Sequence, residues 1–202
     1  MIAVVDYGVG NLFSLCSSLD AIGAKSIVTA DPTEIKKADR IILPGVGAFS
    51  DAKQKLVDSG LDKVIKEEAS LGKPLFGICL GMQMLFEKSF EYGEHQGLGL
   101  LKGKVIGMEG TIPSDLKIPH IGWNPLKFVK QSPIFKYINE GDCVYFVHSF
   151  YAVDCEDSLL ATAEYGKDLT AAVGQGNIYG CQFHPEKSGN VGLKILKAFS
   201  EV

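Results

Sequence analysis

A cysteine between two glycines is the residue best placed to do chemistry in this chain. Cys79 lies in residues 76–83, where an apolar run typical of a strand gives way to a run typical of a helix, with Gly77 before it and Gly81 after it. This pattern is typical of a nucleophile elbow with sulfur in place of oxygen, because glycines let the strand and the helix approach closely. The helix start offers N–H groups and a positive dipole end, which stabilise negative charge. The pattern therefore predicts a cysteine nucleophile.

A histidine and a glutamate far downstream supply the groups that such a nucleophile needs. His184 and Glu186 flank Pro185, and residues two apart in extended backbone project from the same side. We expect Glu186 to hold the tautomer of His184 while the imidazole moves a proton. Alone, a short His-x-Glu string is more often a turn with two solvated side chains. Together with the Cys79 elbow it indicates acyl-transfer chemistry.

Acyl transfer also needs donors for the oxygen of a tetrahedral intermediate. The N–H of Leu80, next after the nucleophile, points to that place in an elbow. The loop 44–47 (Pro-Gly-Val-Gly) follows an apolar run at 40–43, so we expect Val46 and Gly47 to lie at the same strand edge as Cys79. Loss of one such donor raises the activation barrier of acyl-transfer enzymes by about 3 kcal/mol. Our hypothesis is that a peptide flip in this loop adds or removes a donor and so switches activity on and off.

Length and composition favour one α/β domain over residues 1–202. The chain has 202 residues, 46% of them hydrophobic, which fits a single unit with a full core. Its first half alternates short apolar runs with amphipathic ones, which predicts a mostly parallel sheet with helices on both faces. After residue 90 short β-rich pieces predict antiparallel additions to that sheet. The runs read as strands are 2–5, 40–43, 75–79, 104–108, 123–129, 143–147, 159–164, 170–173 and 178–183, and those read as helices are 11–22, 48–56, 61–71, 82–86 and 190–199, with a capped helix start at 31–34.

Charge and cysteine content argue against several other classes of protein. The net charge is −4 without a Lys/Arg block, so we expect no nucleic-acid partner. The first residues lack a basic leader and no run is long enough to span a membrane, so we expect a cytosolic protein. The five cysteines form no Cys-x-x-Cys pair and His95, His120 and His148 lack ligand spacing, so we expect no metal and no disulfide framework. Nothing in the sequence calls for a cofactor.

Two motifs resemble those of the class I (triad) glutamine amidotransferases. They are residues 77–83 (Gly-Ile-Cys-Leu-Gly-Met-Gln) and 184–188 (His-Pro-Glu-Lys-Ser). Residues 6–11 (Asp-Tyr-Gly-Val-Gly-Asn), 44–49 (Pro-Gly-Val-Gly-Ala-Phe) and 120–124 (His-Ile-Gly-Trp-Asn) narrow the resemblance to one branch, the glutaminase subunits of imidazole glycerol phosphate synthase in histidine biosynthesis. The similarity runs from end to end. It implies the flavodoxin-like α/β fold of that class.

The resemblance also implies roles for individual residues. Cys79 would attack the carboxamide carbon of glutamine, His184 would protonate the departing ammonia and Glu186 would orient His184. The implied substrate-binding positions are Gln83, Glu91, His148, Ser149 and Phe150, although Phe150 stands where the family often has tyrosine. Ammonia would pass to a (β/α)₈ barrel cyclase subunit, the heterodimer partner. Asn11, Trp123 and Lys187 match its docking surface, although Trp123 alone would fit the core equally well.

Other functions remain open at the level of sequence. A paralogous amidotransferase subunit that feeds ammonia to a sugar nucleotide in glycan synthesis would begin with the same bond. An autonomous hydrolase of γ-glutamyl compounds would need no partner. A catalytically idle glutamine sensor would not need the Cys79, His184 and Glu186 set. The sequence gives neither the strength of activation by a partner, nor the higher oligomeric state, nor the resting form of the 44–47 loop.

Overall fold

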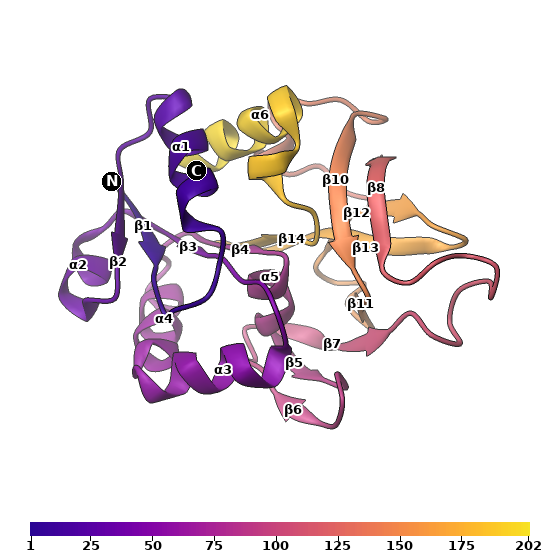
Figure 1. The fold of residues 1–202 in the computed structure, drawn as a ribbon. Helices are drawn as coiled ribbons and strands as arrows, with labels where there is room; N and C mark the ends of the chain where they lie inside the picture. Colours follow the sequence, from indigo (N-terminus) through magenta and orange to yellow (C-terminus); the bar gives the residue numbers. More distant parts are fainter.

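The first half of the chain alternates strands and helices in a computed structural model that describes residues 1–202 (Figure 1). The strands β1 and β4 are buried along their whole length, which is typical of parallel strands covered on both faces. Pro32 begins the second helix, and the Asp31 carboxylate accepts a hydrogen bond from the N–H of Thr33 at 2.7 Å, so the predicted cap is confirmed. The elements are β1 (Ile2–Val5), α1 (Leu12–Ala21), β2 (Ser26–Thr29), α2 (Pro32–Lys37), β3 (Arg40–Leu43), α3 (Phe49–Asp58), α4 (Leu61–Ser70), β4 (Leu75–Ile78) and α5 (Leu80–Met84).

The second half is mostly β-structure and ends in a helix. Residues 123–129, predicted as one strand, form the end of β8 and the short β9, and Pro125 at the break has no N–H to continue the ladder. The elements are β5 (Phe86–Ser89), β6 (His95–Gln96), β7 (Leu101–Gly107), β8 (His120–Pro125), β9 (Lys127–Phe128), η1 (Pro133–Phe135), β10 (Cys143–His148), β11 (Phe150–Val153), β12 (Leu159–Glu164), β13 (Asp168–Gln175), β14 (Ile178–Cys181), η2 (Pro185–Lys187) and α6 (Gly189–Ser200).

An eight-stranded sheet in the order β2-β1-β3-β4-β14-β13-β12-β9 forms the centre of the molecule. The strands from β2 to β14 are parallel to one another, and β13, β12 and β9 continue the sheet in antiparallel pairs. The predicted α/β fold, with a mostly parallel sheet and antiparallel additions in the second half, is confirmed. β4 and β14 are neighbours, so their carboxyl ends bring residues 79 and 184 to one edge of the sheet.

Helices cover both faces of this sheet, and each face has its own core. Alternate residues of β1 point to opposite faces, as the period of a strand requires: Ile2 and Val4 join the core under α1 and α6, whereas Ala3 and Val5 join the core under α2, α3 and α4. In Figure 1 α1 and α6 lie above the sheet, and α3 and α4 lie below it. The carboxyl edge of the main sheet is therefore held between helices packed on both of its faces.

Two smaller sheets stand beside the carboxyl edge. One has the strand order β11-β7-β5-β6, and the other is an antiparallel ribbon of β8 and β10. The turn from β10 to β11 consists of Ser149 alone, so the two small sheets meet at residues 148–150. None of the helices is long and apolar enough to cross a membrane.

Candidate active site

Cys79 occupies a sharp turn between β4 and α5. Its backbone has φ of 53° and ψ of −110°, a conformation that is rare and strained for a residue with a side chain. The flanking glycines are required by space, since a Cβ on Gly81 would lie 1.9 Å from the carbonyl oxygen of Leu43 and one on Gly77 would lie 2.7 Å from that of Gly81. The strand, turn and helix predicted around Cys79 are present.

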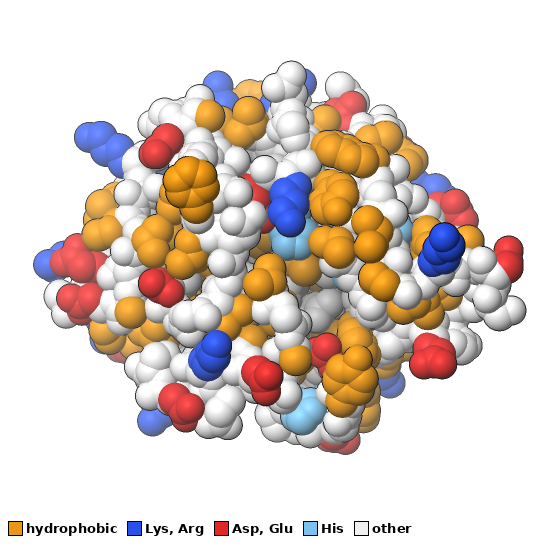
Figure 2. Space-filling view, in the orientation of Figure 1, with side chains coloured by type: hydrophobic (Ala, Val, Ile, Leu, Met, Phe, Trp, Pro, Cys, Tyr) orange, Lys and Arg blue, Asp and Glu red, His pale blue; other side chains and the backbone are white.

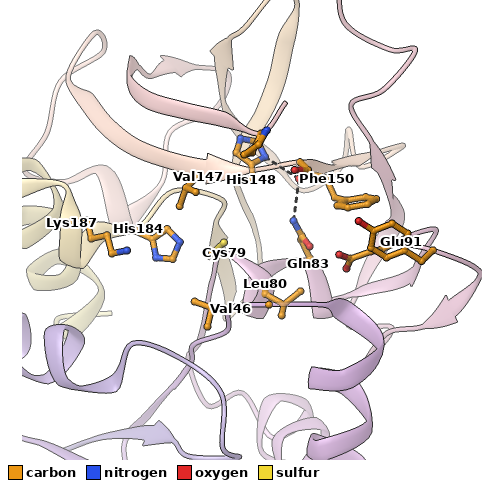
Figure 3. Close-up of a pocket in the computed structure, with 14 residues that line it drawn as sticks. Val46, Cys79, Leu80, Gln83, Glu91, Val147, His148, Phe150, His184 and Lys187 are labelled. Atoms are coloured by element: carbon orange, nitrogen blue, oxygen red, sulfur yellow. Dashed lines mark hydrogen bonds between the residues drawn. The ribbon is translucent and has the colours of Figure 1, made fainter. Parts of the chain in front are cut away.

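His184 and Glu186 form a buried pair next to Cys79. The Nδ1 of His184 lies 2.8 Å from the Oε1 of Glu186, and each side chain is 4% exposed. With Nδ1–H donating to the carboxylate, Nε2 is left for the nucleophile. Figure 3 shows the imidazole and the Cys79 sulfur facing one another. The structure thus brings together the three residues predicted to catalyse the reaction.

The groups around His184 keep its imidazole protonated. Burial lowers the pKa of His184, but hydrogen bonds with Cys79 and Glu186, and the negative charges of both groups, outweigh burial and raise it to about 9. At neutral pH the imidazole is therefore protonated. An imidazolium between a sulfur and a carboxylate is a general acid ready to protonate a leaving amine.

A cavity of about 370 Å³ opens over Cys79. Its wall combines the elbow, the loop after β3, the β10 to β11 corner and the loop after β5 (Figure 3). It collects two of the three predicted catalytic residues, all of the predicted oxyanion and substrate-binding residues, and one predicted interface residue, Lys187. Glu186 lies behind His184 and does not line the cavity. The lining residues are Val46, Gly47, Cys79, Leu80, Gln83, Glu91, Tyr92, Pro119, Val147, His148, Ser149, Phe150, His184 and Lys187.

The loop between β3 and α3 lies against the elbow, where an oxyanion would form. Val46 and Gly47 line the cavity beside Leu80. Gly47 has φ of 92°, which favours glycine. The hydroxyl of Tyr7 donates to the carbonyl of Pro44 at 2.7 Å and so fixes the start of the loop. Burial first, and then the charge of Cys79, raises the pKa of Tyr7, so this hydroxyl stays a donor.

Acceptor groups gather at the end of the cavity away from His184. Gln83 donates through Nε2 to the Phe150 carbonyl at 3.1 Å and to the Gln182 Oε1 at 3.0 Å, so only its Oε1 is left for a ligand. The Glu91 Oε2 accepts from the Phe49 N–H at 2.6 Å. Burial raises the pKa of Glu91, although the Phe49 hydrogen bond opposes this. A carboxylate and an amide oxygen together suit a ligand ammonium group.

Three residues that shape the site through hydrogen bonds or ring contacts were not predicted. Gln182 is fully buried and its Nε2 donates to the Cys79 sulfur at 3.6 Å. Tyr7 anchors the 44–47 loop, and Tyr92 lines the cavity with its ring against Phe150 at 5.9 Å between centroids. Gln182 lies two residues before His184 at the end of an apolar run, and this spacing was a usable signal. Tyr7 and Tyr92 act through contacts that only the fold creates.

Two predicted interface residues lie outside the main cavity. Asn11 lines a much smaller cavity of about 10 Å³ that also touches Glu186. Trp123 is 54% exposed, so it is not a core residue. It lies on the outer face of the β8 and β10 ribbon opposite Tyr145. The Nζ of Lys187 lies 5.9 Å from the centroid of the Tyr145 ring.

This outer face of the ribbon is apolar and solvent-facing. Ile121 and Trp123 are 58% and 54% exposed, respectively. Figure 2 shows apolar side chains gathered over the region of β8 and β10. An exposed apolar patch at the mouth of a cavity is typical of a protein interaction site. No group of three or more His, Cys, Asp or Glu side chains is arranged to hold a metal ion.

Comparison with known proteins agrees with the fold and with the family that the sequence motifs resemble. The family model described as glutamine amidotransferase class-I matches residues 3–201, so fold and site define a chain of this class. The solved structure of PurLQS from Thermotoga maritima is 23% identical, covers 98% of this chain and 96% of its own, and has a TM-score of 0.73, which shows the shared fold.

Much more similar relatives define the branch. The imidazole glycerol phosphate synthase subunit HisH of Bacillus licheniformis is 52% identical over 100% of this chain and 96% of its own length. The same subunit of Oceanobacillus iheyensis is also 52% identical, over 100% and 99%, respectively. The chain therefore belongs to the class I glutamine amidotransferase family, in the branch of the imidazole glycerol phosphate synthase HisH subunits. The resemblance seen in the sequence motifs is confirmed.

Proposed function

We propose that this chain is the glutaminase subunit of an imidazole glycerol phosphate synthase and that residues 1–202 act as one domain. It hydrolyses glutamine to glutamate and passes the ammonia to a cyclase subunit in histidine biosynthesis. The observation that carries the proposal is the buried His184 and Glu186 pair, with a 2.8 Å contact, facing Cys79 at the floor of a 370 Å³ cavity.

The reaction begins with attack of the Cys79 sulfur on the carboxamide carbon of glutamine. The carbonyl oxygen becomes an oxyanion, which accepts from the N–H of Leu80 and from an N–H of the 44–47 loop, at Val46 or Gly47. The tetrahedral intermediate collapses with cleavage of the C–N bond. His184, protonated because its pKa is about 9, gives its proton to the leaving nitrogen. Ammonia and a glutamyl thioester result.

Hydrolysis of the thioester completes the cycle. His184, now neutral, takes a proton from a water molecule, and the hydroxide attacks the thioester carbon. The C–S bond breaks and releases glutamate, and the sulfur and His184 return to their starting state. Glu186 keeps Nδ1 of His184 protonated in both half-reactions, so that Nε2 is always the nitrogen that exchanges the proton.

The acceptor end of the cavity holds the amino acid part of the substrate. Glu91 and the Oε1 of Gln83 receive the α-ammonium group of glutamine. His148, Ser149 and Phe150 form the opposing wall. Phe150 has no hydroxyl, so what it offers toward the pocket is its backbone carbonyl, which accepts from Gln83 and His148.

The apolar outer face of the ribbon receives the partner. Lys187 lines the cavity and, like Trp123, packs near the ring of Tyr145, and Asn11 lines the small cavity that Glu186 also lines. A (β/α)₈ barrel docked here would cover the cavity and receive ammonia directly. Trp123 and Tyr145 are of the residue types that are enriched at binding hot spots.

The proposed function is tested by replacing the nucleophile. Cys79→Ala should abolish glutamate release from glutamine and remove the glutamyl thioester adduct from mass spectra of the wild-type chain under turnover. Its unfolding transition and partner binding should stay close to those of the wild type. Cys181→Ala, at a fully buried thiol outside the cavity, is the control for loss of any cysteine. Glutamate release by the Cys79→Ala variant would refute the assignment.

A further inference from the structure

Two buried histidines meet edge to face at the substrate wall, with ring planes 60° apart. His120 of β8 and His148 of β10 are directly opposite in the antiparallel ribbon, and they are 1% and 6% exposed, respectively. The Nδ1 of His120 lies 3.1 Å from the Nε2 of His148. Neither ring takes part in the proton transfers described above.

Each ring also makes a second contact, and both of these are to oxygen atoms. The Nε2 of His120 lies 2.8 Å from the Oδ1 of Asn124, and the Nδ1 of His148 lies 2.9 Å from the carbonyl oxygen of Phe150. The amide of Asn124 is held in this orientation because its Nδ2 donates to the Glu164 carbonyl at 2.9 Å. Both oxygens are acceptors, so each contact needs a proton on the ring nitrogen.

The number of protons decides the charge of the pair. Three contacts, two to oxygens and one between the rings, need three ring protons. Two neutral imidazoles carry only two, so a neutral pair leaves one contact as two facing lone pairs. All three contacts are satisfied together only when the pair carries one additional proton and one positive charge.

The surroundings of His120 suit such a charge. Its ring lies between the rings of Tyr165, at 4.1 Å and 20°, and Phe146, at 5.0 Å and 21° between centroids and planes. Two stacked aromatic faces stabilise an imidazolium through the ring quadrupole. The Tyr165 hydroxyl donates to the Lys117 carbonyl at 2.8 Å, which holds this ring in place.

We propose that His120 and His148 share one additional proton, and that this proton positions the 148–150 wall of the substrate pocket. The Phe150 carbonyl accepts from both His148 and Gln83. Gln83 bonds Gln182, which donates to the Cys79 sulfur. A continuous set of hydrogen bonds therefore joins the pair to the nucleophile. The pair acts by position, not on the reacting atoms.

The titratable groups around the pair determine how strongly the shared proton is bound. Burial lowers the pKa of His120, and it lowers the pKa of His148 to about 3, with the charges of His120 and His184 adding to the effect. From β12, Glu164 contributes its carbonyl, and its carboxylate bonds the N–H of Gly166 instead. No carboxylate compensates the pair. The shared proton is therefore released as pH rises, on the acid side of the ordinary histidine pKa, and the contact between the rings then opens.

For its effect on glutamine binding this inference rests on the proposed function. Loss of the shared proton opens the contact between the two rings, so the 148–150 wall is no longer tied through His148 to His120 of β8. The KM for glutamine should then rise about threefold to tenfold, the range that one intramolecular hydrogen bond contributes. The kcat should change less, because Cys79, His184 and Glu186 keep their contacts.

The direct test is nuclear magnetic resonance of the histidine ring nitrogens in the ¹⁵N-labelled full chain between pH 5 and 9. The chain has four histidines, and His95 serves as the internal reference. We expect one proton-uptake step with the same midpoint on His120 and His148, with Nε2 of His120 and Nδ1 of His148 protonated throughout. Two neutral rings over the whole range, or two unrelated midpoints, would overturn the proposal.

Substitution of the stacking residue gives a matched pair of variants. Tyr165→Leu removes the aromatic face and should move the shared midpoint, and the rise in KM, to lower pH. Tyr165→Phe keeps the stacked ring and loses only the hydrogen bond to Lys117, so it should move both much less. If both variants shift equally, the stack does not hold the charge and the proposal fails. His120→Gln places an amide donor near His148 without a shared proton, so the KM rise within this window should disappear.

The two readouts separate this inference from the proposed function. Absence of glutamine hydrolysis at every pH would remove the proposed function, whereas the ring-nitrogen titration would still decide whether the proton is shared. A normal glutaminase whose two rings titrate independently would keep the function and remove this inference.

Discussion

The charge of Glu186 should set the protonation state of His184. Glu186→Gln keeps an oxygen acceptor for the Nδ1–H of His184 and removes the negative charge. Burial then continues to lower the pKa of His184, and Cys79 alone opposes it. We therefore expect the pKa of His184 to fall from about 9 by about one to two units.

The size of the effect follows from the raised pKa. The increase from 6.5 to about 9 corresponds to roughly 3 kcal/mol of stabilisation of the imidazolium, at about 1.4 kcal/mol per unit. Because this pKa is raised in the folded state, the contribution is fully present below pH 6.5 and is lost as pH rises through about 9. Glu186→Gln should therefore cost about 1.4–3 kcal/mol at pH 6 and little at pH 10.

Two assays measure this prediction. Ring-nitrogen titration gives the pKa of His184, and urea unfolding at pH 6 and pH 10 gives the free energy of unfolding. Glutamine hydrolysis at neutral pH should fall about tenfold to a hundredfold, the same free energy expressed as a rate. Glu67→Gln, at an exposed carboxylate on α4, is the control. An unchanged His184 pKa near 9, or an equal loss of stability at both pH values, would refute the reasoning.

Three further substitutions test the elbow, the docking surface and the substrate end of the cavity. Gly81→Ala should destabilise the fold by about 3 kcal/mol or more in urea unfolding, since its Cβ would lie 1.9 Å from the Leu43 carbonyl oxygen. Lys187→Glu should weaken binding of the cyclase subunit about fivefold in titration calorimetry, as loss of an exposed charge contact does. Glu91→Gln should raise the KM for glutamine about tenfold or more, because a charged hydrogen bond is lost. In the wild type, whose Glu91 pKa is raised, the KM should rise as pH falls through that pKa, and the variant should lose this dependence.

Matched controls separate these effects from general ones. Gly23→Ala also places a Cβ on a glycine, but in open space with φ of 72°, so it should cost only about 1 kcal/mol. If Gly81→Ala lowered the free energy of unfolding by no more than Gly23→Ala does, the steric argument would be wrong. Lys25→Glu lies next to β2, at the far edge of the main sheet, and equal loss of affinity there would remove Lys187 from the interface. Glu94→Gln changes an exposed carboxylate in the same loop as Glu91 and should leave the KM unchanged.

Local pattern was enough to find the elbow and much of the sheet. The strands Ile2–Val5, Arg40–Leu43 and Leu159–Glu164 have the predicted bounds, because each is a short apolar run with clear ends. The strand Ser26–Thr29 was not predicted, since an edge strand with half-exposed residues has a weak hydrophobic signal. The pairing of β4 with β14, which brings Cys79 and His184 together, depends on the tertiary fold and has no local sequence signal.

Contacts between residues far apart in the chain could not be predicted from the sequence, even where, as for Gln182, the spacing marked the residue. Tyr7 fixes the 44–47 loop across 37 positions, and Gln182 reaches Cys79 across 103. His120 was noted only in a family motif and as a poor metal ligand, and His148 was predicted to bind substrate, so the sequence did not predict that the two rings meet. Their pairing depends on the register of β8 against β10, which no local pattern specifies.

The most direct test of the account is glutamate release from glutamine by the purified full chain, measured alone and then with a (β/α)₈ barrel cyclase subunit and its ribonucleotide ligand. A gated glutaminase should be slow alone and strongly stimulated when partner and ligand are both present, with the Cys79→Ala variant inactive throughout. Equal activity under all conditions would contradict the account and would indicate an autonomous hydrolase.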